Sequence, residues 1–231
     1  MRLFIRLRKI LEVNGTDFCC GDRYTLKLDA FGALPMATTT QKLTFADYLT
    51  YDDGSGTRYE LVDGGLVPMG IGTGLHGAIA EFLTEQFKAA AQRAGQPWTA
   101  KDMRIGVRSP RSTRWDTSRI PDVVLLPTVQ WEAMRIKEAI IELTDPPPLL
   151  VVEVVSDSTV ATDYRTKHSE YSVLDIPEYW IVDPLKGQVT IGCLQAGRYD
   201  DEVFTGNQVV RCSVLPGLTL TAQQVLSAAL S

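Results

Sequence analysis

The sequence predicts an α/β fold in which a mixed central sheet is flanked by helices and extra strands. Residues 149–155 (LLVVEVV) form an almost unbroken apolar run rich in valine, which is typical of a strand buried on both faces. Residues 76–93 repeat apolar side chains at helical spacing. The composition, with 45% apolar and 22% charged residues over 231 positions, suits one packed domain with appended segments.

Residues 1–35 differ in character from the rest of the chain. The opening MRLFIRLRKIL is basic and apolar, but no small-residue cleavage pattern follows it. The stretch from Met36, MATTTQKLTFADYL, is typical of the start of a natural protein. We therefore expect residues 1–35 to be an appendage or an upstream extension of the reading frame, and residues 36–231 to form a single domain. Peptides N-terminal to Met36 in mass spectrometry of the natively expressed protein would refute this interpretation.

The first part of the domain shows a short helix, a hairpin and a long helix. Thr44 and Asp47 form a weak capping box that marks the start of the short helix. Residues 58–69 (RYELVDGGLVPM) alternate around the turn residues 63–65, which predicts two strands joined by a tight turn. The long helix, over residues 76–93, carries an apolar stripe made by Ile79, Phe82, Leu83, Phe87 and Ala90.

The alternation of apolar and polar residues and the positions of the prolines predict the remaining elements. Three prolines at 146–148 end the segment 128–144, which is helical or irregular, and precede the buried strand 149–155. The other expected elements are strands near 98–107 and 119–126, a helix near 160–174, a hairpin of strands 178–183 and 187–194, a strand near 208–214 and a helix at 221–230.

Three charged residues occupy positions where the pattern predicts apolar side chains. Glu153 is the only charge in the run 149–155, and a buried carboxylate is costly unless it is paired, protonated or bound to a metal. Asp122 follows Pro121 at the head of IPDVVLL, where proline implies a strand start or a bulge. Lys167 is the only charge on a helical stripe that we expect to face the sheet, together with Val160, Tyr164, Tyr171 and Leu174.

These three groups together suit hydrolysis of a phosphodiester. Two carboxylates that converge on one point repel each other unless a cation joins them. Mg²⁺ or Mn²⁺ takes oxygen ligands and activates a water molecule for attack on phosphorus. A nearby lysine orients or deprotonates that water, or offsets charge on the phosphate. Two simpler interpretations stay open: a structural ion pair between Glu153 and Lys167, and a turn or cap role for Asp122.

Residues 43–191 resemble a large bacterial family of putative restriction endonucleases within the PD-(D/E)XK superfamily. The stretches that carry the resemblance are YELVDGGLVPM (59–69), His76 at the start of a helix, PDVVLLP (121–127) and, most specifically, VVEVVSDSTVATDYRTKHSEYSVLDIPEYWIVDP (151–184). The resemblance implies a restriction-endonuclease-like core of the α-β-β-β-α-β kind within residues 36–231. It also implies an endonuclease that hydrolyses DNA with Mg²⁺ or Mn²⁺.

The family's motif can be matched to this chain position by position. By that resemblance Asp122 and Glu153 would be metal ligands, and the backbone carbonyl of Val154 would be a third. The motif lysine should stand two residues after the glutamate, where this chain has Val155. Several branches of the superfamily resemble a solution in which the lysine lies on the following helix, and Lys167 would then take the catalytic role.

Four further residues are candidates for the site. Glu60, in the YEL-type strand, would approach the metal or orient its water, or would be an ordinary charge on a strand face. His76 would contact phosphate or the metal-bound water, or cap a helix. Asp163, four residues before Lys167, is expected to pair with it and tune its pKa. Ser156 would bind phosphate or cap the helix that follows.

Charge and the missing motif lysine keep a second function open. The net charge of −5 is unlike the basic excess of proteins that grip DNA through its phosphates. With Val155 in the lysine position, the alternative is an inactive nuclease-fold module that binds nucleic acid or protein. A homodimer is expected only by analogy, because cleavage of a duplex needs two cuts.

Composition also gives an expectation for the compartment. The four cysteines match no zinc pattern, and a chain of this length needs no disulfides, so we expect reduced thiols and a cytoplasmic location. No run of eighteen apolar residues occurs, so no membrane partner is expected.

Overall fold

The computed structural model describes residues 42–109 and 116–229, which form two β-sheets and the helices around them. The expectation for residues 1–35 lies outside these described residues. No helix within the two ranges is long and apolar enough to cross a membrane.

The smaller sheet has five strands in the order β2-β1-β5-β4-β7. Its strands are β1 (Tyr59–Val62), β2 (Gly65–Pro68), β4 (Gly106–Ser109), β5 (Thr117–Arg119) and β7 (Ile140–Ile141). The hairpin of β1 and β2 is confirmed, and its turn residues Asp63 and Gly64 have φ of 51° and 72°. Two consecutive positive φ angles match the twist of a two-residue hairpin. The short helix α1 (Phe45–Leu49) precedes it, with the predicted capping box of Thr44 and Asp47.

The larger sheet has six strands in the order β11-β10-β9-β8-β6-β3. Its strands are β3 (Trp98–Asp102), β6 (Val123–Pro127), β8 (Leu150–Val154), β9 (Glu178–Asp183), β10 (Gln188–Gln195) and β11 (Arg198–Thr205). β8 lies in the interior of this sheet, antiparallel to β6 and parallel to β9, and all five of its residues are buried. The predicted mixed sheet with a central valine-rich strand is therefore confirmed.

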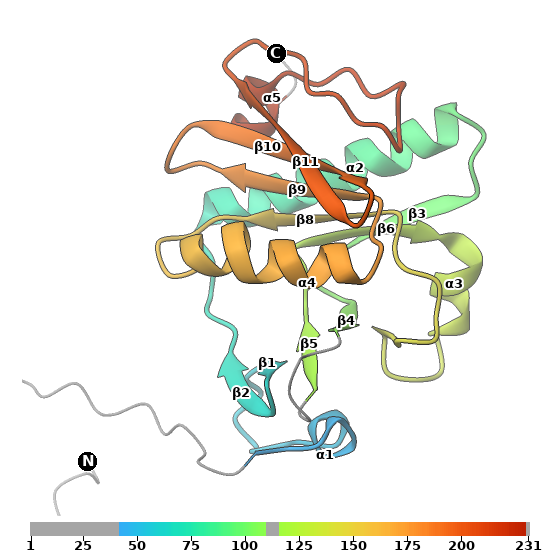
Figure 1. Cartoon of the computed structure of the whole chain (residues 1–231), viewed down its shortest axis with the longest axis vertical. Coiled ribbons are helices and arrows are strands. Elements are labelled where there is room, and N and C mark those ends of the chain that lie inside the picture. The colour runs from blue at the N-terminus through green and yellow to red at the C-terminus, as the bar shows by residue number, and fades with distance from the viewer. Residues whose placement is uncertain (1–41, 110–115, 230–231) are drawn as a thin grey trace, which may run out of the picture. The chain divides into compact units, whose positions relative to one another are not determined.

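Helices cover both faces of the larger sheet (Figure 1). On one face, α2 (Gly74–Arg93) and α5 (Ala222–Ser227) pack with Val152 and Val154 of β8 in one hydrophobic core, and the predicted stripe of α2 is buried there. On the other face, α4 (His168–Val173) packs over Val151 and its neighbours in a second core. Since side chains alternate along a strand, Glu153 faces the α4 side. The short helix α3 (Thr128–Ala133) follows β6.

Two strands that the sequence predicts as continuous are each broken in the structure. The expected strand 98–107 divides into β3 and β4 at Met103, which has a φ of 43°. The expected strand 119–126 divides into β5 and β6 around Pro121, which has no N–H to donate to a ladder. In both cases one half pairs in the smaller sheet and the other half in the larger sheet. Asp122 thus lies where the chain passes from one sheet to the other.

The C-terminal part corrects a second prediction. No strand forms near 208–214, where only an isolated bridge joins Val209 to Thr221. The strand that was missed is β11, which pairs with β10 along its whole length but buries only Phe204. Val210 and Cys212 are buried instead by packing against the α2 core, so apolar alternation there reflects contact without pairing.

Candidate active site

Asp122 joins three elements at one end of the larger sheet. Its Oδ1 accepts a hydrogen bond from Nε2 of His76 at 2.9 Å, and its Oδ2 accepts one from the backbone N–H of Val154 at 2.6 Å. The register that pairs Val123 with Val152 continues beyond the start of β6, so Asp122 stands beside Glu153. The side chain is 10% exposed. The two sheet-borne acids are therefore neighbours, as the sequence predicts.

His76 reaches Asp122 from the first turn of α2. The cap of that helix is Thr73, whose side chain accepts from the backbone N–H of His76, so the cap interpretation of His76 is wrong. The hydrogen bond to Asp122 raises the pKa of His76 against the opposing effect of burial. Its Nδ1 atom is buried and has no hydrogen-bond partner in the described part of the chain. The imidazole therefore extends the group of polar side chains at Asp122.

Glu153 and Lys167 form a buried ion pair across the interface between β8 and the helix above it. Nζ of Lys167 lies 2.8 Å from Oε2 of Glu153, and the hydroxyl of Tyr171 donates to Oε1 at 2.6 Å. Glu153 is 2% exposed and Lys167 is 6% exposed. Lys167 thus points at the sheet, and both oxygens of Glu153 have a donor from the same helix. The role of Tyr171 was missed, because its place on an apolar stripe indicated only packing.

The helix that carries Lys167 is locally widened. Residues Thr162–Lys167 form a π-helical segment that runs directly into α4. Asp163 and Lys167 lie on one face of this segment, where Oδ1 of Asp163 lies 3.1 Å from Nζ of Lys167. The predicted pairing of these two residues is present. No donor within the two described ranges meets hydrogen-bond geometry at either oxygen of Asp163, although the residue is 1% exposed.

Acidic side chains outnumber basic ones at this cluster. Burial raises the pKa of Glu153 well above its ordinary value, although Lys167 opposes that rise, and burial likewise raises the pKa of Asp163. For Lys167, burial acts to lower the pKa, but the surrounding carboxylates outweigh it and raise the pKa, so the ammonium keeps its charge. Three buried carboxylates face one ammonium and one imidazole. A cation bound here would favour the ionised form of these carboxylates.

Glu60 belongs to a neighbouring network that sequence reasoning missed. Its Oε1 accepts from the backbone N–H of Ile120 at 3.0 Å, and its Oε2 accepts from Nη1 of Arg119 at 3.1 Å. The same guanidinium forms a two-pronged contact with Glu170, at 2.8 Å from Nε and 3.1 Å from Nη2. Arg119 is three residues before Asp122, and its only signal in the sequence was a charge inside a short strand.

The loop after β8 contains the remaining candidate. Ser156 donates its backbone N–H to the hydroxyl of Thr159, and the two hydroxyl oxygens lie 3.1 Å apart. These contacts form a turn before the helix, in agreement with a structural role for Ser156. Val155, in the position of the family's motif lysine, is 4% exposed and packs in the core beneath α4.

Comparison with known proteins places this arrangement in a family. The sequence profile of the family described as "Uma2: Putative restriction endonuclease" matches residues 45–223, which is well over half of the chain. The chain belongs to the Uma2 family. The resemblance predicted from the motif residues is therefore confirmed.

The fold of this Uma2 protein is also found among solved structures. The chain is similar to the crystal structure of a "putative nuclease belonging to DUF820" from Anabaena variabilis ATCC 29413, with a TM-score of 0.62 and 17% identity. The similarity covers 80% of this chain and 98% of that chain, and at this identity it shows the fold alone. No curated protein matches the chain.

Asp122 and Glu153 of the Uma2 chain have free acceptor sites for a divalent cation. Each oxygen of Asp122 and Glu153 accepts one protein donor and keeps a second acceptor site, because a carboxylate oxygen has two. The excess of acidic side chains also favours a cation. Within residues 42–109 and 116–229, however, no group of three or more His, Cys, Asp or Glu is arranged to hold a metal ion. Asp122 and Glu153 therefore offer two carboxylates for a cation, and a third ligand from the backbone carbonyl of Val154 stays a prediction.

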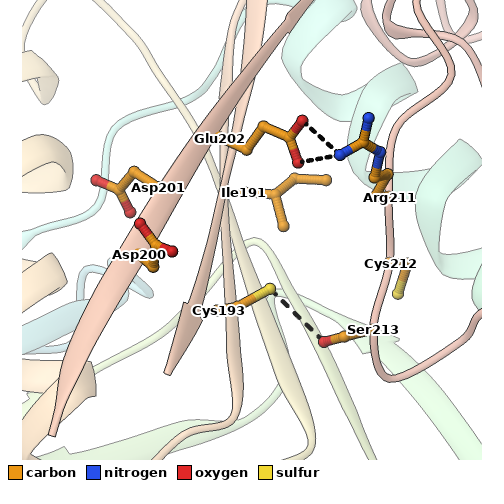
Figure 2. Close-up of a pocket in the computed structure, with 8 residues that line it drawn as sticks. All are labelled: Ile191, Cys193, Asp200, Asp201, Glu202, Arg211, Cys212 and Ser213. Atoms are coloured by element: carbon orange, nitrogen blue, oxygen red, sulfur yellow. Dashed lines mark hydrogen bonds and ion pairs between the residues drawn. The ribbon is translucent and has the colours of Figure 1, made fainter. Parts of the chain in front are cut away.

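A pocket of about 460 Å³ lies elsewhere in the chain, beside β10 and β11. Figure 2 shows its lining, in which Arg211 pairs with Glu202 and Cys193 contacts Ser213. Ile191, which lines the pocket, belongs to the core on the α2 face of the larger sheet, whereas Glu153 faces α4. None of the predicted site residues lines it. Substitutions in this pocket therefore leave the predicted site residues in place.

Proposed function

We propose that this Uma2 protein is a divalent-metal-dependent endonuclease that hydrolyses phosphodiester bonds of DNA. The observation that carries the proposal is the position of Lys167. Its ammonium is buried against Glu153 at 2.8 Å, at the end of the sheet where Asp122 stands in the neighbouring strand. This is the place that a lysine displaced from position 155 has to reach.

The side chains have separable roles in the proposed reaction. Asp122 and Glu153, with the carbonyl of Val154, would hold Mg²⁺ or Mn²⁺. His76 orients Asp122 through the 2.9 Å hydrogen bond. Because the surrounding carboxylates raise its pKa, Lys167 acts as a fixed positive charge that stabilises the phosphate in the transition state, and not as a general base at neutral pH.

The cation supplies the chemistry that these side chains lack. A bound Mg²⁺ polarises a phosphoryl oxygen and lowers the pKa of a water molecule. Asp163 belongs to the same arrangement, since its contact with Lys167 holds the ammonium against Glu153. Glu60 supports the site through Ile120 and Arg119, and orientation of the attacking water is its proposed second role.

One alternative has its own support. The carboxylates of Asp122 and Glu153 already have protein donors, Val155 replaces the motif lysine, and the net charge is −5. These observations favour an inactive nuclease-fold module that binds nucleic acid or protein. The two functions differ in one measurable property, which is cleavage of DNA by the purified chain.

Plasmid nicking in Mg²⁺ or Mn²⁺ tests the proposal. We expect the wild-type chain to nick supercoiled plasmid, and Asp122→Asn, Glu153→Gln and Lys167→Met to lower the rate at least about 100-fold, because each removes a ligand or a charge at the reacting phosphate. Glu202→Gln, in the pocket of Figure 2, is the matched control and should nick like wild type. Equal nicking by wild type and Asp122→Asn would contradict the proposal. DNA binding without nicking would favour the inactive module.

The partners and compartment complete the proposal. We expect duplex DNA as substrate and a cytoplasmic location. We also expect a homodimer, because two active sites allow both strands to be cut in one encounter. Light scattering on the purified chain measures the dimer, and a monomer mass would contradict that part alone.

A further inference from the structure

A buried guanidinium connects the two parts of the candidate site. We call Arg119, Glu60 and Glu170 the Arg119 clamp. Arg119 contacts Glu170 through Nε and Nη2 at 2.8 and 3.1 Å and Glu60 through Nη1 at 3.1 Å, so three nitrogens of the fork are used. The guanidinium side chain is 4% exposed, and the side chains of Glu60 and Glu170 are 12% and 9% exposed. Such planar, two-pronged contacts fix direction as well as distance.

The clamp joins three elements that are far apart in the sequence. Arg119 ends β5, three residues before Asp122, and Glu170 lies on α4, three residues after Lys167. Glu60 lies on β1, and its other oxygen accepts from the backbone N–H of Ile120. The guanidinium is therefore tied to the strand junction before Asp122 and to the helix turn after Lys167.

Stability alone does not account for such a group. Burial of one cation and two anions removes all three from water, and replacement of buried ion networks by apolar side chains of similar size is often neutral or stabilising. An apolar contact would also pack α4 onto the strand junction, but it would let the helix slide or rotate. The charged fork adds a fixed separation and orientation between the two elements.

We propose that Arg119 is a positioning residue, which fixes the helix of Lys167 against the strand junction of Asp122. It touches neither the reacting phosphate nor the cation, and acts through the elements on either side. The catalytic consequence rests on the proposed nuclease function, whereas the fixed position of the helix does not. Because misplacement by about 1 Å lowers rates about 100-fold, a loosened helix should slow the reaction while the chain stays folded.

The test replaces the ionic clamp by an apolar contact. In Arg119→Met/Glu170→Met we expect a melting temperature close to that of wild type and faster amide exchange, by hydrogen–deuterium exchange mass spectrometry, in residues 59–68 and 162–173. In plasmid nicking we expect kcat to fall about 10- to 100-fold with KM for DNA unchanged. Arg119→Lys keeps the charge without the fork and should lie between the double variant and wild type.

Single and remote variants complete the design. In Arg119→Met alone, the carboxylates of Glu60 and Glu170 lose their guanidinium, so the melting temperature of this variant should drop. Comparison with the double variant separates the effect of unbalanced charge from the effect of a displaced helix. The matched control is Arg211→Met/Glu202→Met, an exposed ion pair in the pocket of Figure 2, which should change neither exchange in 162–173 nor kcat.

Each result of the exchange and nicking experiments supports or overturns one part of the proposal. Unchanged exchange in the double variant would overturn the proposal whatever the activity. Faster exchange with unchanged kcat would overturn it as well, since the site would then tolerate the loosened helix. If the wild-type chain nicks no DNA, the nuclease proposal fails, and the exchange data alone decide whether Arg119 holds the helix.

Discussion

At the residue scale, Lys167 shows why a cation belongs in this part of the core. Its side chain is 8% exposed and contacts two carboxylates, those of Glu153 and Asp163, which are 3% and 1% exposed. A buried ammonium without partners would lose its proton, and buried carboxylates without a cation would take one up. The ammonium of Lys167 therefore keeps its charge through the carboxylates, and it opposes the rise that burial causes in the pKa of Glu153.

The first prediction concerns the stability of Lys167→Met. Loss of the ammonium breaks a buried pair, so the free energy of unfolding should fall by about 3–5 kcal/mol near pH 8. The loss should be smaller near pH 5. Without Lys167, the pKa of Glu153, already raised by burial, rises further above its unfolded value. A carboxyl with a raised folded pKa stabilises the fold at low pH, and that stability is lost as the pH rises through the folded pKa.

Urea titrations at both pH values measure this effect. Arg135→Met is a suitable comparison, because Arg135 pairs with Glu132 on the surface, with side chains 70% and 49% exposed, and such pairs contribute at most about 1 kcal/mol. A deficit in Lys167→Met that is the same at both pH values would show that packing, and not charge, explains the loss.

At the element scale, the π-helical segment sets the direction of Lys167. Widened turns are rare in helices and often occur at functional sites. Here the segment Thr162–Lys167 places Asp163 and Lys167 on one buried face, while α4 beyond it keeps Tyr171 against Glu153. Because a π-helix closes i→i+5 hydrogen bonds, each residue turns through a smaller angle than in an α-helix, so the segment changes the direction of Lys167 relative to the turn before it.

The second prediction removes one residue from the widened turn. Deletion of the exposed Thr166 should restore α-helical spacing and place Asp163 three residues before Lys167 instead of four. We expect an unchanged helix signal in circular dichroism but a loss of nicking of about 100-fold, because the shortened turn shifts the ammonium of Lys167 relative to Glu153 and Asp163. Thr166→Ala keeps the length and should behave like wild type. Full nicking by the deletion variant would show that the widened turn has no role.

At the scale of the whole molecule, the site lies where the two sheets meet. The chain crosses between the sheets after β3 and again before β6, and the second crossing contains Asp122. The Arg119 clamp spans the same junction from β1 to α4. A cation held by Asp122 and Glu153 would therefore stabilise the packing of several elements at once.

The third prediction follows from mass action. A ligand that binds only the folded state at about 100 times its Kd adds about 2.7 kcal/mol. For a domain of this size that corresponds to a rise of about 5–10 °C in Tm. We expect this rise with saturating Mn²⁺ in wild type and in Glu202→Gln, and none in Asp122→Asn. An equal rise in Asp122→Asn would place the cation elsewhere, and no rise in any variant would contradict the proposed metal site.

Much of the fold could be predicted from local patterns. The apolar run of β8, the stripe of α2, the capping box of Thr44 and the hairpin turn at Asp63 each have a short-range cause, and each is present. β11 could not be predicted, because an edge strand with one buried residue has no apolar alternation, and only its pairing with β10 makes it a strand. The broken strands escaped prediction for a related reason, since the presence of a second sheet decides where each half pairs.

The candidate site, like the fold, could be predicted from the sequence only in part. By itself, the sequence determined that Glu153 and Lys167 would be buried, because one charge in an apolar run or stripe has no route to solvent. It also determined the family, through motif stretches between residues 59 and 184. Only the tertiary structure decided that Arg119, Glu60 and Glu170 meet, and that the helix widens before α4. The charge of Arg119 is compensated by residues that are far apart in sequence, and no local pattern encodes that contact.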